Sequence, residues 1–379
     1  MTTRLRAVLG PLVLVLASLL FALVLGEIVV RVAFPPAPAT LGERLLASGA
    51  YEGHPVLGWR PRPNASHHSQ RFNASFTTNS RGLRDRERSL ERTPGVQRIV
   101  VLGDSFAWGY GVNDGEVFPR LVESMLERTE VVNLGVTAFG IRQEFDYLKL
   151  EGALYKPDIV ILALCQNDIY RDGRTPHETF RAVTAPASSR KAPPTFLGSP
   201  KAWVAERVQL YRVTQQAINA NRSLVKALVA LGLKDELRGF EGLDNNLMPA
   251  LMKYPPQLQS SWDTTQAELL EIRDWLAERK IPFVLALIPA RQAIEPKSFQ
   301  HTIAYTVYES TDFELDKPYR NLESFGRANG IEVINGYPAL KRKGETGVSL
   351  YLRNDIHFNA AGHEAFAAEI AGYLQRSPR

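Results

Sequence analysis

Two segments far apart in this chain carry residues suited to nucleophilic chemistry. Ser105 follows an apolar run and the turn residues Gly103 and Asp104. A neutral hydroxyl is a poor nucleophile and needs a base within hydrogen-bond reach. His357 can be that base because imidazole titrates near neutrality, and Asp355 can hold its tautomer. The sequence therefore predicts a catalytic triad of Ser105, His357 and Asp355, provided that the fold brings the two segments together.

Attack on an acyl carbonyl also needs fixed donors for the oxygen that becomes negatively charged. We expect the backbone N–H of Ser105, a backbone N–H of residues 133–140 and the side-chain amide of Asn167 to form this oxyanion hole. Within residues 133–140 the expected donor is Ala138, and Gly135 is the nearby alternative.

The elements that must position these residues alternate between strand and helix. Apolar runs typical of buried strands begin at residue 98 and cover 130–133, 158–164, 282–288 and 331–334. Helical patterns cover 116–128, 142–154, 264–280, 320–329 and 360–374. This alternation predicts an α/β fold with a parallel sheet and helices on both faces. Ligands bind beyond the carboxyl ends of such strands, which is where the candidate residues lie in the sequence.

The N-terminus differs from the rest of the chain. Arg4 and Arg6 precede an uncharged apolar run over residues 7–26, long enough at about 1.5 Å per residue to cross a hydrocarbon core of about 30 Å. We expect an uncleaved anchor with its N-terminus in the cytoplasm and the remainder extracytoplasmic. A cleaved signal peptide and a buried soluble helix are the alternatives.

The predicted organisation has three parts. Residues 1–34 form a cytoplasmic tip and transmembrane anchor, 35–97 a juxtamembrane extension, and 98–379 a catalytic domain with a helical insertion at about 171–258.

Composition excludes several classes of protein. The 379 residues are 45% hydrophobic and 22% charged, which is ordinary for a globular protein. The net charge of +5 is scattered, so no nucleic-acid footprint is present. Cys165 is the single cysteine, so no intrachain disulfide can form, and we expect it to be an inert core residue. No zinc spacing occurs, and we expect neither a metal nor a cofactor.

Four segments, taken in order, resemble the SGNH (GDSL-type) hydrolase family in its membrane-anchored bacterial branch: 103–105, 133–140, 165–168 and 355–357. The resemblance covers about 98–374 apart from the insertion, and residues 78–85 resemble sequence that precedes the first block in anchored members. It implies a flavodoxin-like three-layer α/β/α sandwich and ester hydrolysis or acyl transfer.

Two positions depart from the family pattern. The second block usually has glycine where this chain has Ala138. The common last block is Asp-x-x-His, which places Asn354 at the aspartate position. An Asp-x-His spacing occurs in SGNH-like alginate O-acetyltransferases, and this favours Asp355, with Asn354 as the alternative.

The expected function is a membrane-anchored serine esterase that removes O-acyl groups, acetyl groups on a glycan included. An O-acetyltransferase acting on an extracytoplasmic glycan is the first alternative, and an inactive SGNH-fold binding or scaffold protein is the second. The expected partners are an acylated small molecule or glycan and the membrane, without nucleic acid. The sequence indicates neither the acyl group nor an oligomeric state.

Overall fold

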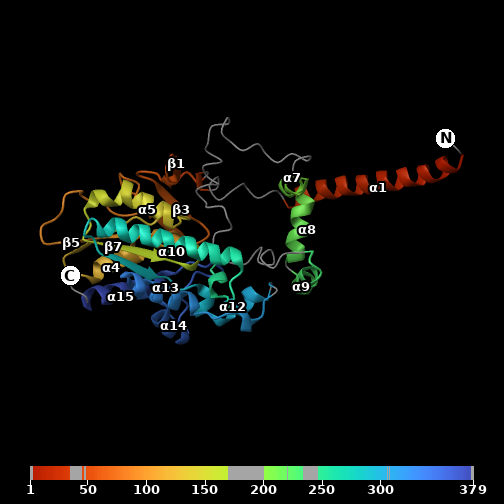
Figure 1. Ribbon diagram of the computed structural model, residues 1–379. Coiled ribbons are helices and arrows are strands. Elements are labelled where there is room, and N and C mark those ends of the chain that lie inside the picture. The colour runs from red at the N-terminus through yellow and green to blue at the C-terminus, as the bar shows by residue number, and fades with distance from the viewer. Residues whose placement is uncertain are drawn as a thin grey trace. The chain divides into compact units, whose positions relative to one another are not determined.

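The computed structural model describes residues 3–34, 45–46, 48–169, 200–219, 221–233, 246–304, 306 and 308–376 (Figure 1). The chain divides into two compact units. One comprises Met1–Ala39 and Ser189–Glu241, and the other comprises Thr40–Ser188 and Gly242–Arg379.

A parallel five-stranded sheet forms the centre of the larger unit. Its strands are β5 (Gln97–Gly103), β6 (Thr129–Asn133), β7 (Ile159–Leu164), β8 (Phe283–Leu287) and β9 (Glu332–Asn335), in the order β6-β5-β7-β8-β9. This is the doubly wound order of flavodoxin-like folds, in which ligands bind where the strand order reverses. Here that point lies between β5 and β7. Every residue of β7 and β8 is buried, which explains their unbroken apolar sequence.

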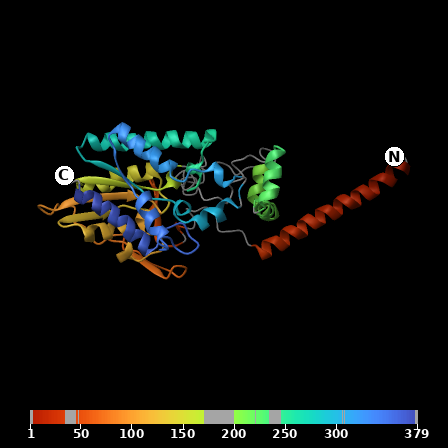
Figure 2. The same ribbon diagram turned by 90° about the horizontal axis from the view of Figure 1, so that it is seen from below.

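Helices cover both faces of the sheet, as the sequence predicts. α5 (Ile141–Leu150) and α10 (Pro256–Ala277) pack together on one face, where the rings of Phe145 and Trp275 meet edge-on with their centroids 6.0 Å apart. α4 (Phe118–Met125) and α15 (Ala360–Arg376) pack together on the other face (Figure 1, Figure 2). The three-layer α/β/α architecture and the five expected strands are confirmed.

Other helices complete the larger unit: α3 (Ser105–Trp108), α11 (Arg291–Ile294), α12 (Pro296–Ile303), α13 (Lys317–Asn329) and α14 (Tyr337–Glu345). α13 begins slightly before the expected helix, and α10 begins at Pro256 rather than near residue 264. α11, α12 and α14 were not expected, because segments of four to nine residues carry too few turns for a helical period to stand out.

Two small hairpins precede the sheet, where the sequence suggested an extension without periodicity. β1 (Tyr51–His54) pairs with β2 (Gly58–Pro61), and β3 (Ser66–Ser69) pairs with β4 (Ala74–Thr77), both antiparallel. They belong to the same compact unit as the sheet. The division of the chain at residue 97 remains a prediction.

The smaller unit contains α1 (Thr3–Ala33), α7 (Pro200–Arg207), α8 (Gln209–Asn219) and α9 (Arg222–Ala230). Gly10–Ala33 is long and apolar enough to cross a membrane, and none of this segment is buried in the structure, unlike the core helix of a soluble protein. An anchor and a signal sequence both fit this helix. Residues 171–199 and 234–245 of the predicted insertion lie outside the described residues, and its last part, 246–258, belongs to the larger unit.

Candidate active site

Ser105 occupies the carboxyl end of β5, where the chain turns sharply into α3. Gly103 has φ +153, and a Cβ there would lie 2.9 Å from the carbonyl oxygen of Ala163, so only glycine fits. Asp104 caps α3, and its Oδ1 accepts a hydrogen bond from the Phe106 N–H at 2.9 Å. The turn therefore presents Ser105 as the first residue of a helix at the carboxyl end of the strands.

The structure brings Ser105, His357 and Asp355 together from opposite ends of the chain. Ser105 Oγ lies 2.7 Å from His357 Nε2, and His357 Nδ1 lies 2.6 Å from Asp355 Oδ1. With the proton on Nδ1, the imidazole donates to the carboxylate and accepts from the serine hydroxyl. This is the hydrogen-bond order required of a nucleophile, its base and an orienting acid.

The geometry also shows that Asp355, and not Asn354, faces His357. Asn354 adopts a left-handed backbone with φ +57, and the carboxylate of the next residue turns to His357. Asp355 Oδ1 additionally accepts the backbone N–H of His357 at 3.2 Å. Burial alone would raise the pKa of Asp355, but its hydrogen bond to His357 and the charges of His357 and Arg71 hold that pKa below its usual value.

Asn167 follows β7, the strand beside β5, and its half-buried side chain lies at the same edge as the triad. Its amide Nδ2 donates to Asp104 Oδ2 at 3.2 Å, and Asp104 Oδ2 lies 3.3 Å from Ser105 Oγ. One carboxylate thus connects the serine turn with the Asn167 loop at the point where the strand order reverses.

A family model matches the C-terminal part of the chain. Residues 249–379, which carry His357 and Asp355, match the model of the family described as SGNH hydrolase-like domain, acetyltransferase AlgX. The C-terminal third of the chain is thus similar to an SGNH hydrolase-like domain. No curated protein sequence matches it.

Solved structures with a related fold are distant from this SGNH protein in sequence. A lipolytic G-D-S-L protein from Veillonella parvula is 13% identical, with 74% of this chain and 100% of that chain covered at a TM-score of 0.40. A GDSL-like lipase from Bacteroides thetaiotaomicron is 11% identical, with 74% and 88% covered at a TM-score of 0.37. A putative acylhydrolase from Bacteroides fragilis is 11% identical, with 76% and 91% covered at a TM-score of 0.39.

The second SGNH segment favours Ala138 over Gly135 as the backbone donor. Ala138 has φ +64, the left-handed conformation that explains why the family usually has glycine here. The N–H of Gly135 already donates to Asn133 Oδ1 at 2.9 Å. A Cβ on Gly135 would lie 2.4 Å from the backbone of Ala107, so this glycine is required for close packing against α3.

The loop between β3 and β4 reaches the triad, and nothing in the sequence pattern predicted this contact. Arg71 Nη2 donates to Asp355 Oδ2 at 3.1 Å. The next residue, Phe72, packs edge-on against Tyr110 at 5.3 Å between ring centroids, and Tyr110 packs against the His357 ring at 4.6 Å. This hairpin of the extension therefore contacts the acid of the triad directly and reaches the base through Tyr110.

The upstream segment 78–85 has a structural explanation. Arg84 is buried, and its guanidinium donates to the carbonyl oxygens of Trp108, Gly109 and Val112 at 2.9, 2.6 and 2.7 Å. These carbonyls belong to the end of α3 and the loop that follows. Arg84 thus fixes the chain directly after the serine turn, which accounts for its occurrence ahead of the first SGNH block.

Cys165 lies beside the site but is held by a network of hydrogen bonds. Its sulfur lies 3.4 Å from Asp104 Oδ2 and 2.5 Å from Asn167 Oδ1, either of which can accept the single thiol proton, and its N–H donates to Asp168 Oδ2 at 3.1 Å. Ligand atoms of Asp104, Cys165 and Asp168 lie within 4.8 Å of one another. Burial, followed by the neighbouring charge of Asp104, raises the pKa of the thiol well above its usual value. A protonated thiol is a hydrogen-bond donor here.

His363, the other histidine of the last segment, has a structural role. Its Nδ1 accepts the backbone N–H of Phe118, the first residue of α4, at 3.3 Å. Burial, together with the positive charges of Arg84 and His357, lowers the pKa of His363 to about 3. It therefore stays neutral and joins α15 to α4.

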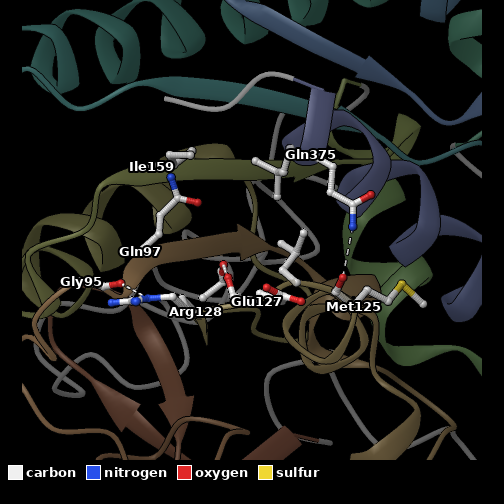
Figure 3. Close-up of a pocket in the computed structure, with 10 residues that line it drawn as sticks. Gly95, Gln97, Met125, Glu127, Arg128, Ile159 and Gln375 are labelled. Atoms are coloured by element: carbon white, nitrogen blue, oxygen red, sulfur yellow. Dashed lines mark hydrogen bonds between the residues drawn. The ribbon is translucent and has the colours of Figure 1, made fainter.

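A cavity of about 550 Å³ lies at the amino end of the strands, opposite the end that carries the triad (Figure 3). Its lining includes Gln97, Thr129 and Ile159, which are the first residues of β5, β6 and β7. Ser105 follows the last residue of β5, so this cavity is at the amino end of the strands and is not where an ester would meet the nucleophile.

Proposed function

We propose that this SGNH protein cleaves O-acyl esters through an acyl-Ser105 intermediate. The observation that carries the proposal is the continuous hydrogen-bond chain from Ser105 Oγ through His357 to Asp355, at 2.7 and 2.6 Å. An inactive scaffold protein would not need this chain, which joins two segments from opposite ends of the sequence.

The mechanism follows from these contacts. Ser105 Oγ attacks the acyl carbon while His357 Nε2 takes the hydroxyl proton, and Asp355 stabilises the imidazolium. The Ser105 N–H, the Ala138 N–H and the Asn167 amide are assigned to the tetrahedral oxyanion. His357 then protonates the leaving alcohol as the carbon–oxygen bond breaks. Water, deprotonated by His357, attacks the acyl-serine, and the carboxylic acid and free Ser105 are released.

A panel of small acyl esters tests this proposal on the purified full chain. We expect turnover with Ser105 and none above background with Ser105→Ala, with both proteins unfolding at the same temperature. Turnover that survives in folded Ser105→Ala would refute the acyl-Ser105 pathway.

O-acetyl transfer to a glycan hydroxyl is the second candidate, and one observation favours it. The family matched over residues 249–379 is described by an acetyltransferase, and the matched part carries both Asp355 and His357. Hydrolysis and transfer share the acyl-serine step, so the triad cannot distinguish them. A sugar acceptor requires a surface that positions its hydroxyl and limits competing water.

Product partition distinguishes the two fates. A small acetyl donor is supplied with and without glycan oligomers, and free acetate and acetylated oligomer are both quantified. Acetate release that no oligomer changes supports the esterase. Acetylated oligomer forming faster than acetate would assign the enzyme to transfer.

We also propose that α1 anchors the enzyme with the catalytic unit outside the cytoplasm. The support is the apolar segment Gly10–Ala33 together with Arg4 and Arg6 before it. A phosphatase reporter fused after Arg379 is active only when it is exported. We expect activity, together with a full-length protein in the membrane fraction. An inactive reporter would contradict the orientation, and a shortened soluble product would indicate a signal peptide.

A further inference from the structure

The smaller unit contains a charged residue in an unusual place. Glu27 lies within the apolar segment Gly10–Ala33. An ionised carboxylate is costly in a membrane unless it is paired, and such residues usually have a specific partner. Glu27 has three: its carboxylate oxygens accept the backbone N–H groups of Gln209 and Leu210 at 2.9 and 2.8 Å, and Arg31 lies 2.6 Å away.

These contacts join the end of α1 to the start of α8. The two N–H groups belong to the first turn of α8, whose unpaired donors and positive dipole end favour a carboxylate. Arg31 Nη2 donates to the carbonyl oxygen of Arg207 at 2.5 Å, and Gln209 Nε2 donates to that of Phe34 at 3.0 Å. The helical insertion is thus fastened to the C-terminal turns of the anchor.

The position of this junction along α1 sets its depth in a bilayer. The 24 residues of Gly10–Ala33 extend about 36 Å, whereas the hydrocarbon core is about 30 Å thick. The last turns of α1, which hold α8, therefore lie near the boundary between acyl chains and headgroups.

One exposed stripe along α9 and the turn after it is apolar. Leu224 and Leu231 are 41% and 70% exposed, and exposed Ala227 lies between them at the i, i+3, i+7 spacing of one helix face. Val225, by contrast, is fully buried. Leu233, just after α9, is 73% exposed. A helix facing water normally presents polar residues on its exposed side.

Charge complements this apolar face. Residues 200–233 contain five basic residues and a single acid. A basic helical segment with one apolar face is typical of helices that lie in the interface of a membrane with anionic lipids.

We infer that α8 and α9 form a membrane-interface module, held at that depth by Glu27, with Leu224, Leu231 and Leu233 inserted among lipid acyl chains. Its partner is a bilayer with anionic headgroups. The inference rests on the proposed role of α1 as an anchor, and it goes further because an anchor alone does not require a second contact with lipid.

Lipid quenching of a fluorophore tests this contact on the full chain. Single cysteines at Leu231, at Thr214 and at Leu20 are labelled with NBD in nanodiscs of phosphatidylcholine and phosphatidylglycerol, with and without doxyl-labelled lipid. Thr214 is the exposed polar control on α8, and Leu20 is the control inside the anchor. Cys165 is buried, and the chain without an added cysteine measures its background. We expect quenching at 231 to approach that at 20 and to exceed that at 214.

A second variant tests the role of Glu27. Glu27→Ala removes the acceptor for both N–H groups of α8, so quenching at 231 should fall while quenching at 20 stays the same. Unchanged quenching at 231 would overturn the role of Glu27 in holding the module.

The other outcomes separate the inference from the proposal on which it rests. Quenching at 20 with water-like emission at 231 would leave the anchor intact and refute the module. Blue-shifted but unquenched emission at 231 would show that protein, not lipid, covers the leucines, which also refutes it. Absence of quenching at 20 would refute the anchor itself.

Discussion

Replacing Asp355 by asparagine should disable the base while leaving the loop in place. Asp355 Oδ1 accepts from both Nδ1 and the backbone N–H of His357, and Oδ2 faces Arg71 Nη2 at 3.1 Å. An asparagine has only one acceptor oxygen. If that oxygen faces His357, the amide NH₂ opposes the guanidinium of Arg71. If the amide flips, NH₂ opposes Nδ1 and stabilises the wrong imidazole tautomer.

The size of the loss follows from this conflict. The corresponding amide substitution in a Ser-His-Asp triad costs about 10⁴-fold in kcat. We expect Asp355→Asn to lose about 10³- to 10⁴-fold in kcat/KM on a small ester, or about 4–5.5 kcal/mol of transition-state stabilisation. Adding Arg71→Ala removes the opposing donor. The kcat/KM of the double variant should therefore be several-fold higher than that of Asp355→Asn alone, which corresponds to about 1 kcal/mol, the size of an interaction between exposed charged groups.

Asn354→Gly is the matched control. Asn354 has φ +57, so glycine keeps the left-handed backbone that alanine would strain, and only the exposed side chain is lost. We expect this variant to retain kcat/KM within about threefold, since the typical surface substitution changes free energy by about 0.5 kcal/mol. A larger loss for Asn354→Gly than for Asp355→Asn would refute the reasoning and return the orienting role to the Asp-x-x-His position.

Four further predictions concern other parts of the site. Arg71→Ala removes a positive charge that helps to hold the pKa of Asp355 below its usual value, so the acidic limb of the kcat/KM profile should move up by a few tenths of a pH unit at low salt, and Arg71→Lys should restore it. Asn167→Ala should lower kcat by about 10²- to 10³-fold, measured on the same ester, with unchanged melting temperature. Ala138→Gly should raise the melting temperature by about 1–2 °C. Glycine removes the cost of a left-handed alanine, about 1–2 kcal/mol, but loses about 0.5–1 kcal/mol more conformational entropy on folding. The pKa of His363 is lowered from 6.5 to about 3, so between these values only the unfolded chain binds the extra proton, and the protein becomes less stable as the pH decreases. Urea unfolding should show that the free energy of unfolding decreases by about 2 kcal/mol from pH 7 to pH 5, and that this decrease is smaller in His363→Gln.

The sheet and the serine turn were predictable because their signals are local. The strands of a parallel sheet are buried on both faces, so each appears as an apolar run, and polar residues directly after such runs must meet at one edge. Ser105 and Asn167 follow β5 and β7, which are neighbours in the sheet. Their proximity follows from the strand order, which the structure shows, whereas the alternation of elements indicates only that the sheet is parallel.

The details that depend on single backbone conformations were not predictable. Asp355 and Asn354 are adjacent, and only the left-handed turn at 354 shows which side chain faces His357. Asparagine is among the residues that adopt this conformation most readily, which is the one signal the sequence contained. The choice between Ala138 and Gly135 similarly required knowing that the Gly135 N–H is already bonded to Asn133.

The contribution of the extension was missed for a different reason. β3 and β4 have four residues each, too few for an alternating pattern to be recognised among polar residues. Arg71 lies in the loop between them, and an exposed arginine in a loop carries no sign of a partner near the other end of the chain. Only the folded structure shows that it reaches Asp355.

Covalent labelling of Ser105 tests the central claim most directly. The full chain is treated with a fluorophosphonate, which modifies a serine only when a base activates it, and the modified peptide is identified by mass spectrometry. The account predicts one adduct, on the peptide that contains Ser105, and no adduct on Ser105→Ala of the same melting temperature. An unmodified full chain, or an adduct that persists on the folded Ser105→Ala protein, would contradict it.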